Sequence, residues 1–290
     1  MKFYGLVLGL FLSMGGFAFA DSFVKLSDGK VHYELSGPAN GPLVVLVHGV
    51  SGPMMVWDNN VDALTEEGYQ VLRFDLYGRG SSDRLKKTYD LPLYVRELSE
   101  LLAALKLDKP VNLVGSSMGA IISTAYTLQN PEKVQRLALI GPGGFELQTP
   151  PIMMDIKTPD VSDVIFAVVG EKAIMEQNER YFYQPENFTD FLDAFKTQLE
   201  IPGSLTAILS TLRSVPLENY IDQYAKLDGM KQKVMVIWGT EDISFPYENH
   251  TTLLQALPHA DFIGVSRAAH LPQYEQPELV NLNLTQFLKR

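Results

Sequence analysis

Six short runs of apolar residues recur along the chain, and most of them are continuous rather than alternating with polar residues. Continuous runs of this length are typical of strands that are covered on both faces of a parallel sheet. The runs occupy residues 43–49, 70–75, 110–115, 134–140, 233–238 and 260–265. Ahead of them, residues 23–36 alternate on both sides of Asp28-Gly29, and this pattern predicts a β-hairpin.

Helical periodicity occupies several of the intervals between these strands. In residues 93–107 the apolar side chains recur at a spacing of three or four, and Asp90 or Pro92 is placed to start the helix. Residues 121–129 and 280–288 predict two more helices. Strands and helices in alternation predict an α/β fold with a mostly parallel sheet and helices on both faces. In such sheets the ligand site lies at the carboxyl ends of the strands.

The alternation is interrupted between residues 146 and 228, where no buried strand is indicated. Helical pieces are expected at 161–177, 188–199 and 203–213, separated by prolines, and many of the residues are aromatic or apolar. We interpret this stretch as a helical cap inserted into the sheet. The expected organisation is a first core segment over 21–145, the cap over 146–228 and a second core segment over 229–290.

Residues 1–20 have the pattern of a secretory signal peptide. Lys2 is followed by an uncharged apolar stretch, and the small residues Ala18 and Ala20 precede Asp21. We therefore expect export, to the periplasm or outside the cell, with cleavage near Ala20. The alternative is an uncleaved membrane anchor, because residues 3–20 are nearly long enough to span a bilayer; only then is membrane contact expected.

Composition narrows the classes of partner. The formal net charge of the 290 residues is −10, which disfavours binding to nucleic acid. There is no cysteine, and the five histidines do not group at metal-ligand spacing, so neither a metal nor another cofactor is expected.

Residues 115–119, Gly-Ser-Ser-Met-Gly, fit the pattern G-x-S-x-G between a predicted strand and a predicted helix. A serine in this context lies on a sharp turn that exposes its hydroxyl above the sheet, and only small side chains fit at Gly115 and Gly119. The N-terminus of the following helix favours negative charge at the same place. Ser117 is therefore a candidate nucleophile.

A serine nucleophile needs a base, and the base needs an acid that orients it. Asp242 and His270 each follow a predicted strand, which places both at the same edge of the sheet as Ser117. The chain order of serine, aspartate and histidine is the one expected for this architecture. Glu241 is the rival acid.

With these motifs the chain resembles the α/β-hydrolase family, of the capped serine ester-hydrolase type. The segment beginning with His48 resembles the family's H-G-x oxyanion segment, and residues 75–82 resemble its D-x-x-G-x-G-x-S loop. Residues 269–278 resemble its G-H-x-x-x-x-E-x-P segment, with Ala269 in place of the usual glycine.

The resemblance implies roles for these residues. Ser117 attacks, His270 carries the proton, and Asp242 holds the imidazole. The backbone N–H groups of Val50 and Met118 form the oxyanion hole, with Ser51 as a second choice. The expected substrate pocket comprises Met54, Met55, Trp57, Met153 and Met154.

The expected reaction is hydrolysis of a carboxylic ester, acyl or lipid-like, through an acyl-serine intermediate. The apolar cap favours a small apolar ester substrate for this carboxylesterase or lipase-like enzyme. Two alternatives remain open. One is a hydrolase of carbon–carbon bonds in diketones, whose H-G-S-G-P-G segment is half matched by residues 48–54. The other is a receptor that keeps the pocket without turnover.

Overall fold

An eight-stranded sheet organises the molecule. The computed structural model describes residues 22–148 and 161–290, so the expected signal segment 1–20 lies outside the described residues. The strand order is β1-β2-β4-β3-β5-β6-β7-β8. Their bounds are β1 Ser22–Lys25, β2 Lys30–Ser36, β3 Leu43–Val47, β4 Gln70–Phe74, β5 Val111–Ser116, β6 Val134–Ile140, β7 Lys233–Gly239 and β8 Asp261–Val265.

The pairing confirms the predicted α/β class with a mostly parallel sheet. Strands β1 and β2 form the predicted hairpin, and β2 pairs antiparallel with β4, while β3 to β8 are joined only by parallel pairings. All five residues of β3 and all six of β5 are buried. These strands are covered on both faces, which explains their continuous apolar sequences.

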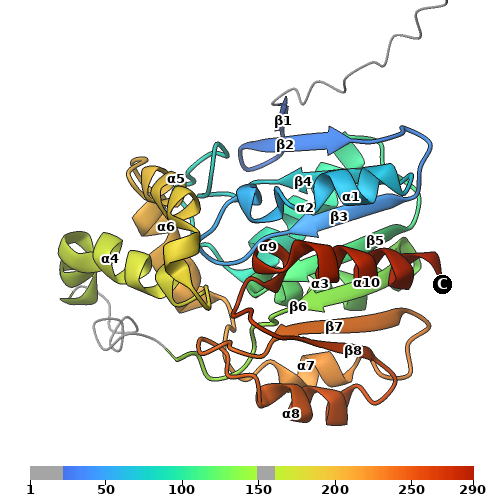
Figure 1. Cartoon of the computed structure of the whole chain (residues 1–290). Coiled ribbons are helices and arrows are strands. Elements are labelled where there is room, and N and C mark those ends of the chain that lie inside the picture. Colours follow the sequence, from blue (N-terminus) through green and yellow to red (C-terminus); the bar gives the residue numbers. More distant parts are fainter. Residues whose placement is uncertain (1–21, 149–160) are drawn as a thin grey trace, which may run out of the picture.

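Helices cover both faces of the sheet. On one face α1 contacts α10, and on the other α2 contacts α3, which in turn contacts α7, and α7 contacts α8. Figure 1 shows α1 and α10 in front of the sheet and α3 behind it. The bounds are η1 Met54–Trp57, α1 Val61–Glu66, α2 Leu91–Ala104, α3 Met118–Gln129, η2 Pro131–Lys133, α7 Ile221–Ala225, α8 Asn249–Ala256, α9 Pro272–Glu275 and α10 Pro277–Lys289.

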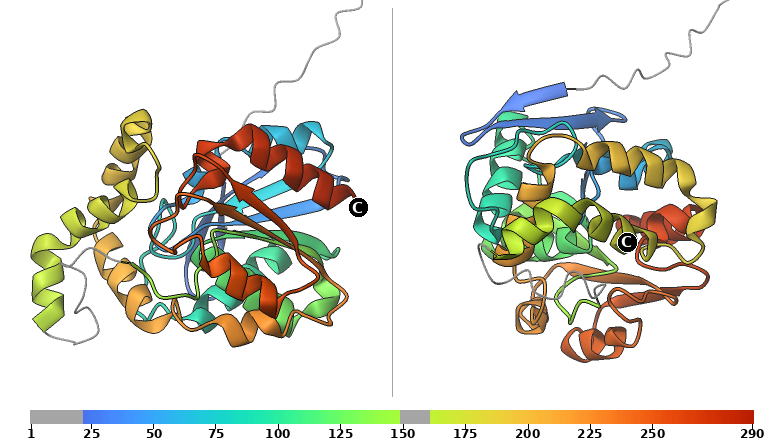
Figure 2. Two further views of the ribbon diagram at one scale, coloured as in Figure 1. Left: turned by 60° about the horizontal axis from the view of Figure 1, so that its bottom comes forward. Right: turned by 90° about the vertical axis from the view of Figure 1, so that its left-hand side faces the viewer.

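Three helices form a separate layer beyond the carboxyl ends of the parallel strands. They are α4 Val161–Glu179, α5 Thr189–Leu199 and α6 Ser204–Ser214, and each contacts the other two; η4 Pro185–Asn187 lies between α4 and α5. Figure 1 shows this layer to the left of the sheet, and the right-hand view of Figure 2 looks onto it. The aromatic rings of Phe182, Phe188 and Phe191 pack on one another and on Tyr274 of the core.

Helix α7 differs from the sequence interpretation. The predicted cap over 146–228 includes α7, but this helix packs against α3 and α8 of the core. The chain therefore returns to the core after α6. No helix in the described parts of the chain is long and apolar enough to cross a membrane.

Candidate active site

Ser117 lies between the end of β5 and the start of α3, in a strained conformation with φ 57° and ψ −120°. Its N–H donates to the carbonyl oxygen of Ile140 at 2.9 Å, which ties the turn to β6. A Cβ atom on Gly115 would lie 2.3 Å from the carbonyl oxygen of Gly119, and one on Gly119 would lie 2.0 Å from that of Val47. Backbone therefore occupies the space of both side chains, as the motif predicts.

Asp242 and His270 lie in the loops after β7 and β8. Oδ2 of Asp242 is 2.8 Å from Nδ1 of His270, and both side chains are fully buried. The other carboxylate oxygen accepts the N–H groups of Ser244 and Phe245, at 2.9 and 3.0 Å. Glu241 is instead exposed and accepts the hydroxyl of Thr240. The structure therefore brings Asp242, and not Glu241, to the imidazole.

The other nitrogen of His270 is not engaged by the carboxylate of Asp242. Nε2 is buried and has no hydrogen-bond partner among the described residues. His270 and Ser117 line one cavity of about 20 Å³, which is room for about one water molecule. Within the described residues no hydrogen bond joins Ser117 Oγ to this nitrogen. With its proton on Nδ1, held by the carboxylate, the imidazole keeps the lone pair of Nε2 available to accept a proton.

Two backbone N–H groups adjoin the same cavity. Val50 lines it, and Met118 begins α3, where the N–H groups of the first turn have no partner within the helix. Among the described residues, no hydrogen bond engages the N–H of Val50 or of Met118. The positive end of the α3 dipole adds to their attraction for an oxyanion.

Buried side chains hold the loop that carries Val50. The guanidinium of Arg79 donates through Nε to the carbonyl oxygen of Val50 at 2.7 Å. His48 donates through Nδ1 to the carbonyl oxygen of Gly49 at 2.9 Å, and its Nε2 accepts the N–H of Leu76 at 2.9 Å. Burial lowers the pKa of His48 to about 4, so this imidazole is neutral. These contacts fix the direction in which the Val50 peptide faces.

The cap contributes polar side chains that sequence reasoning did not assign to the site. Asn178 lines the Ser117 cavity and donates to the hydroxyl of Ser51 at 3.2 Å. Tyr181 lines both this cavity and a second one together with Ser51. Burial raises the pKa of its phenol to about 12. The ring of Tyr181 lies 4.6 Å from that of His270. No sequence signal marks these residues, because their pairing exists only after the cap folds over the sheet.

A second cavity of about 20 Å³ adjoins Ser117 and is mostly apolar. None of the described side chains that line either cavity is cationic. The apolar side chains of the second cavity are Val50, Leu147, Ile174, Leu212, Leu217 and Phe245.

The predicted pocket residues lie elsewhere. Met54, Met55 and Trp57 belong to η1, and neither of the two cavities is lined by them; η1 presents Val56 instead. Met54 is buried and its N–H donates to Asp75 at 2.9 Å, while Trp57 is completely buried in the core. The other two predicted pocket residues, Met153 and Met154, lie outside the described residues.

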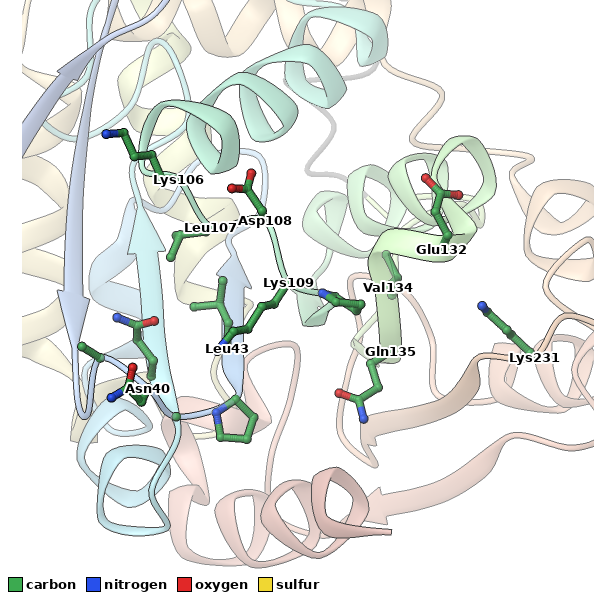
Figure 3. Close-up of a pocket in the computed structure, with 15 residues that line it drawn as sticks. Asn40, Leu43, Lys106, Leu107, Asp108, Lys109, Glu132, Val134, Gln135 and Lys231 are labelled. Carbon is green, nitrogen blue, oxygen red and sulfur yellow. The ribbon is translucent and has the colours of Figure 1, made fainter.

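A cavity of about 720 Å³ lined by described residues is far from this chemistry. It lies at the amino ends of the parallel strands, where Leu43 begins β3 and Val134 begins β6. Figure 3 shows Lys106, Lys109 and Lys231 spread around it rather than converging on a point. The described residues contain no group of three or more histidine, aspartate or glutamate side chains suited to a metal ion.

Comparison with known proteins identifies the family to which the chain is similar. A model of the alpha/beta hydrolase fold matches residues 42–174. A 2-hydroxy-6-oxononadienedioate/2-hydroxy-6-oxononatrienedioate hydrolase of Burkholderia vietnamiensis is 30% identical over 270 residues, covering 90% of this chain and 91% of that protein. A 2-hydroxy-6-oxo-6-phenylhexa-2,4-dienoate hydrolase of Comamonas testosteroni is 26% identical, covering 91% and 93%.

The solved structures agree on the fold. The enol-lactonase from Burkholderia xenovorans aligns with a TM-score of 0.79 and 21% identity, covering 93% of this chain and all of that one. A meta-cleavage product hydrolase from Pseudomonas fluorescens aligns with a TM-score of 0.74 and 22% identity, covering 90% and 94%.

These relatives correct the expected reaction. The prediction of a carboxylic ester as substrate is wrong, because the curated relatives are named for 2-hydroxy-6-oxo dienoates. Such molecules contain no ester, so their hydrolysis breaks a carbon–carbon bond beside the ketone. The triad motif did not reveal this, since the same nucleophile attacks the carbonyl of an ester and of a ketone.

Proposed function

The chain belongs to the α/β-hydrolase fold family, and from this premise we propose that it hydrolyses a carbon–carbon bond in a 2-hydroxy-6-oxo dienoate. The observation that carries the proposal is the 30% identity over 91% of a relative named for such a substrate. The local geometry agrees with it, because a serine, an oriented imidazole and free N–H groups meet at one cavity.

Ser117 and His270 carry the first half of the reaction. The substrate first moves the proton of its C2 hydroxyl to C5, which makes C5 saturated. Nε2 of His270 then takes the proton of the Ser117 hydroxyl while Ser117 Oγ bonds to C6. The π electron pair of the C6 carbonyl moves onto the carbonyl oxygen. The N–H groups of Val50 and Met118 stabilise that oxyanion, each by roughly 100-fold to 1000-fold in rate.

Collapse of this intermediate breaks the C5–C6 bond. The electron pair of the broken bond passes from C5 through the C3–C4 double bond to the C2 oxygen, which receives the proton from the imidazolium of His270. The products so far are a shorter 2-hydroxydienoate and an acyl group on Ser117. Water, deprotonated by His270, then releases the acyl group as a carboxylic acid. Asp242 stabilises the imidazolium in both halves.

The cap supports a role for the oxygen at C2. Ser51, Asn178 and Tyr181 form one polar cluster that lines the Ser117 cavity, in which the amide of Asn178 donates to the hydroxyl of Ser51. Because the pKa of Tyr181 is about 12, its phenol keeps its proton and can donate to the C2 oxygen. We assign this cluster to the hydroxy-acid end of the substrate.

The second cavity supports an apolar group at C6. Its side chains are mostly aliphatic or aromatic, and Arg213, which follows Leu212 on α6, is paired with Asp163 at 2.7 Å. A second carboxylate here would be desolvated without a cation, which costs binding energy. We therefore propose that the C6 substituent is phenyl or alkyl rather than a carboxylate chain.

The test compares two synthetic 2-hydroxy-6-oxo dienoates, one with a phenyl and one with a carboxyethyl group at C6. Loss of the conjugated chromophore gives kcat/KM for each. We expect turnover of both, with a preference for phenyl on the order of tenfold. If neither is consumed by protein whose Ser117 reacts with a fluorophosphonate, the carbon–carbon reaction is excluded.

Export of the chain is a separate proposal that rests on residues 1–20. N-terminal sequencing of protein recovered from the extracytoplasmic fraction should begin at Asp21. An intact N-terminus in the membrane fraction would favour the anchor instead.

A further inference from the structure

Glu275, the last residue of α9, joins two segments that are far apart in the sequence. Its Oε1 accepts the N–H of Ala269 at 2.6 Å, and its Oε2 accepts the N–H of Tyr183 at 2.7 Å. Ala269 directly precedes the imidazole-bearing residue of the site, and Tyr183 lies just beyond α4 of the cap. One carboxylate therefore contacts both the catalytic loop and the cap.

The same two segments are also joined directly. The N–H groups of His270 and Leu271 donate to the carbonyl oxygen of Tyr181, at 3.0 and 3.3 Å. We call residues 181–183 the cap stem and residues 269–271 the histidine loop. The backbone of His270 is thus held against the cap stem and not only by its connection to β8.

We propose that Glu275 is a positioning residue that fastens the histidine loop to the cap stem when it is ionised and releases one of them when it is protonated. The proposal needs the triad of Ser117, Asp242 and His270, but it does not depend on which bond the substrate presents. Glu275 touches none of the reacting atoms and acts through the placement of His270.

Ionisation matters because both contacts of Glu275 are N–H donors. A carboxylate accepts at both oxygens, whereas a protonated carboxyl group carries a hydrogen on one of them and cannot accept both donors equally well. Burial raises the pKa of Glu275 to about 7, although the two N–H groups oppose that rise, and the charge of Asp242 adds to it. The other titratable residues of the histidine loop, cap stem and α9 and their flanks are Arg180, Tyr181, Tyr183, Arg267, His270 and Tyr274.

The direction in which reactivity changes with pH follows from the protonation of Glu275 and His270. As pH rises through about 7, Glu275 loses its proton and the second contact becomes available. His270 must also be neutral to accept the proton of Ser117. The most reactive form therefore has both groups deprotonated, and reactivity should at first fall in acid more steeply than a single base would allow.

The experiment measures the second-order rate at which a fluorophosphonate labels Ser117, from pH 5 to 9, on the full protein. Three chains are compared: wild type, Glu275→Gln, and Glu278→Gln as a matched control. Glu278 is an exposed residue in the first turn of α10, three positions further along. An amide at position 275 presents one oxygen and one N–H₂ group, so it satisfies only one of the two donors at any pH.

For wild type and Glu278→Gln we expect the logarithm of the labelling rate to rise with a slope above one below about pH 7, because protonation of Glu275 adds a loss of up to about tenfold to the loss caused by protonation of His270. For Glu275→Gln we expect a slope of one and a plateau lower by on the order of tenfold, because one charge-assisted contact is lost. A purely structural role would lower the plateau without changing the slope. A slope for Glu275→Gln equal to that of wild type overturns the proposal.

A second measurement covers the case in which Glu275→Gln does not fold. The amide resonances of Tyr183 and Ala269 in the wild-type protein should titrate together with a midpoint near 7, because both N–H groups point at the same carboxylate. Resonances that do not move together in that range overturn the proposal. Since labelling and amide shifts need no substrate, a failure here is distinguishable from a failure of the carbon–carbon reaction.

Discussion

The two ends of the parallel strands offer opposite environments. At the amino ends lies a cavity of about 720 Å³, bordered by Lys106 and Lys109 of the loop between α2 and β5 and by Lys231 ahead of β7 (Figure 3). At the carboxyl ends, two cavities beside Ser117 hold only about 20 Å³ each, yet a buried Asp–His pair, a strained serine and two N–H groups without a partner among the described residues adjoin them.

The difference shows that convergence of polar groups, not volume, identifies the site. The fold produces this asymmetry, because loops after parallel strands bring Ser117, Asp242 and His270 to one edge. Chemistry at this edge needs groups that are already aligned.

The largest effect should come from removing the nucleophile. Ser117→Ala should lower kcat for a 2-hydroxy-6-oxo dienoate by roughly 10⁶-fold, while the melting temperature stays near that of wild type. Lys109→Ala, at the other edge, is the matched control and should leave kcat/KM unchanged. A large loss in Lys109→Ala would mean that the amino edge takes part in the reaction.

The next largest effect concerns the orienting carboxylate. Asp242→Asn should lower kcat by about 10⁴-fold, because the amide favours the wrong tautomer of His270 and cannot stabilise its cation. Glu241→Gln removes the neighbouring, exposed carboxylate and should have almost no effect. Equal losses in the two variants, measured under single-turnover conditions, would contradict the assignment of the acid.

Two glycines test how tightly the two edges are packed. Gly119→Ala should lower the free energy of unfolding by about 3 kcal/mol, because its Cβ would lie 2.0 Å from the backbone of Val47. Gly68→Ala, ahead of β4, places its Cβ in open space and should cost only about 1 kcal/mol for its positive φ. Urea unfolding measures both, and a larger loss at Gly68 would reverse the comparison.

The smallest effect is a change of thermal stability with pH. The pKa of Glu275 is raised in the folded protein from 4.5 to about 7, so the folded state binds the extra proton between these values. Glu275 therefore makes folding less favourable as pH rises through this window. The difference in melting temperature, Glu275→Gln minus wild type, should be larger at pH 8 than at pH 5 by a few degrees. A difference that is constant or falls with pH would contradict the raised pKa.

Sequence patterns predicted what is encoded locally. The strand–Ser117–helix turn and the loops that carry Asp242 and His270 follow directly from apolar runs and small residues, so the sheet and the three side chains were placed correctly at one edge. The pocket depends less on local sequence: η1 presents Val56 to the cavity beside Ser117, and the direction of such a short helix depends on what it packs against. Trp57 is buried in the core for that reason.

The serine motif also did not predict which bond of the substrate is broken. A Ser–His–Asp arrangement activates attack on any carbonyl, and the bond that breaks is chosen by what binds on either side of it. We propose that in this protein those determinants include Ser51, Asn178 and Tyr181, which line one cavity only in the folded protein.

The most direct test of the central claim is a product balance for 2-hydroxy-6-oxo-6-phenylhexa-2,4-dienoate, followed by mass spectrometry with wild type and Ser117→Ala in parallel. The account predicts equal amounts of benzoate and a five-carbon 2-hydroxydienoate from wild type, and neither from the variant. Intact substrate or only its keto tautomer from the wild-type protein would contradict it.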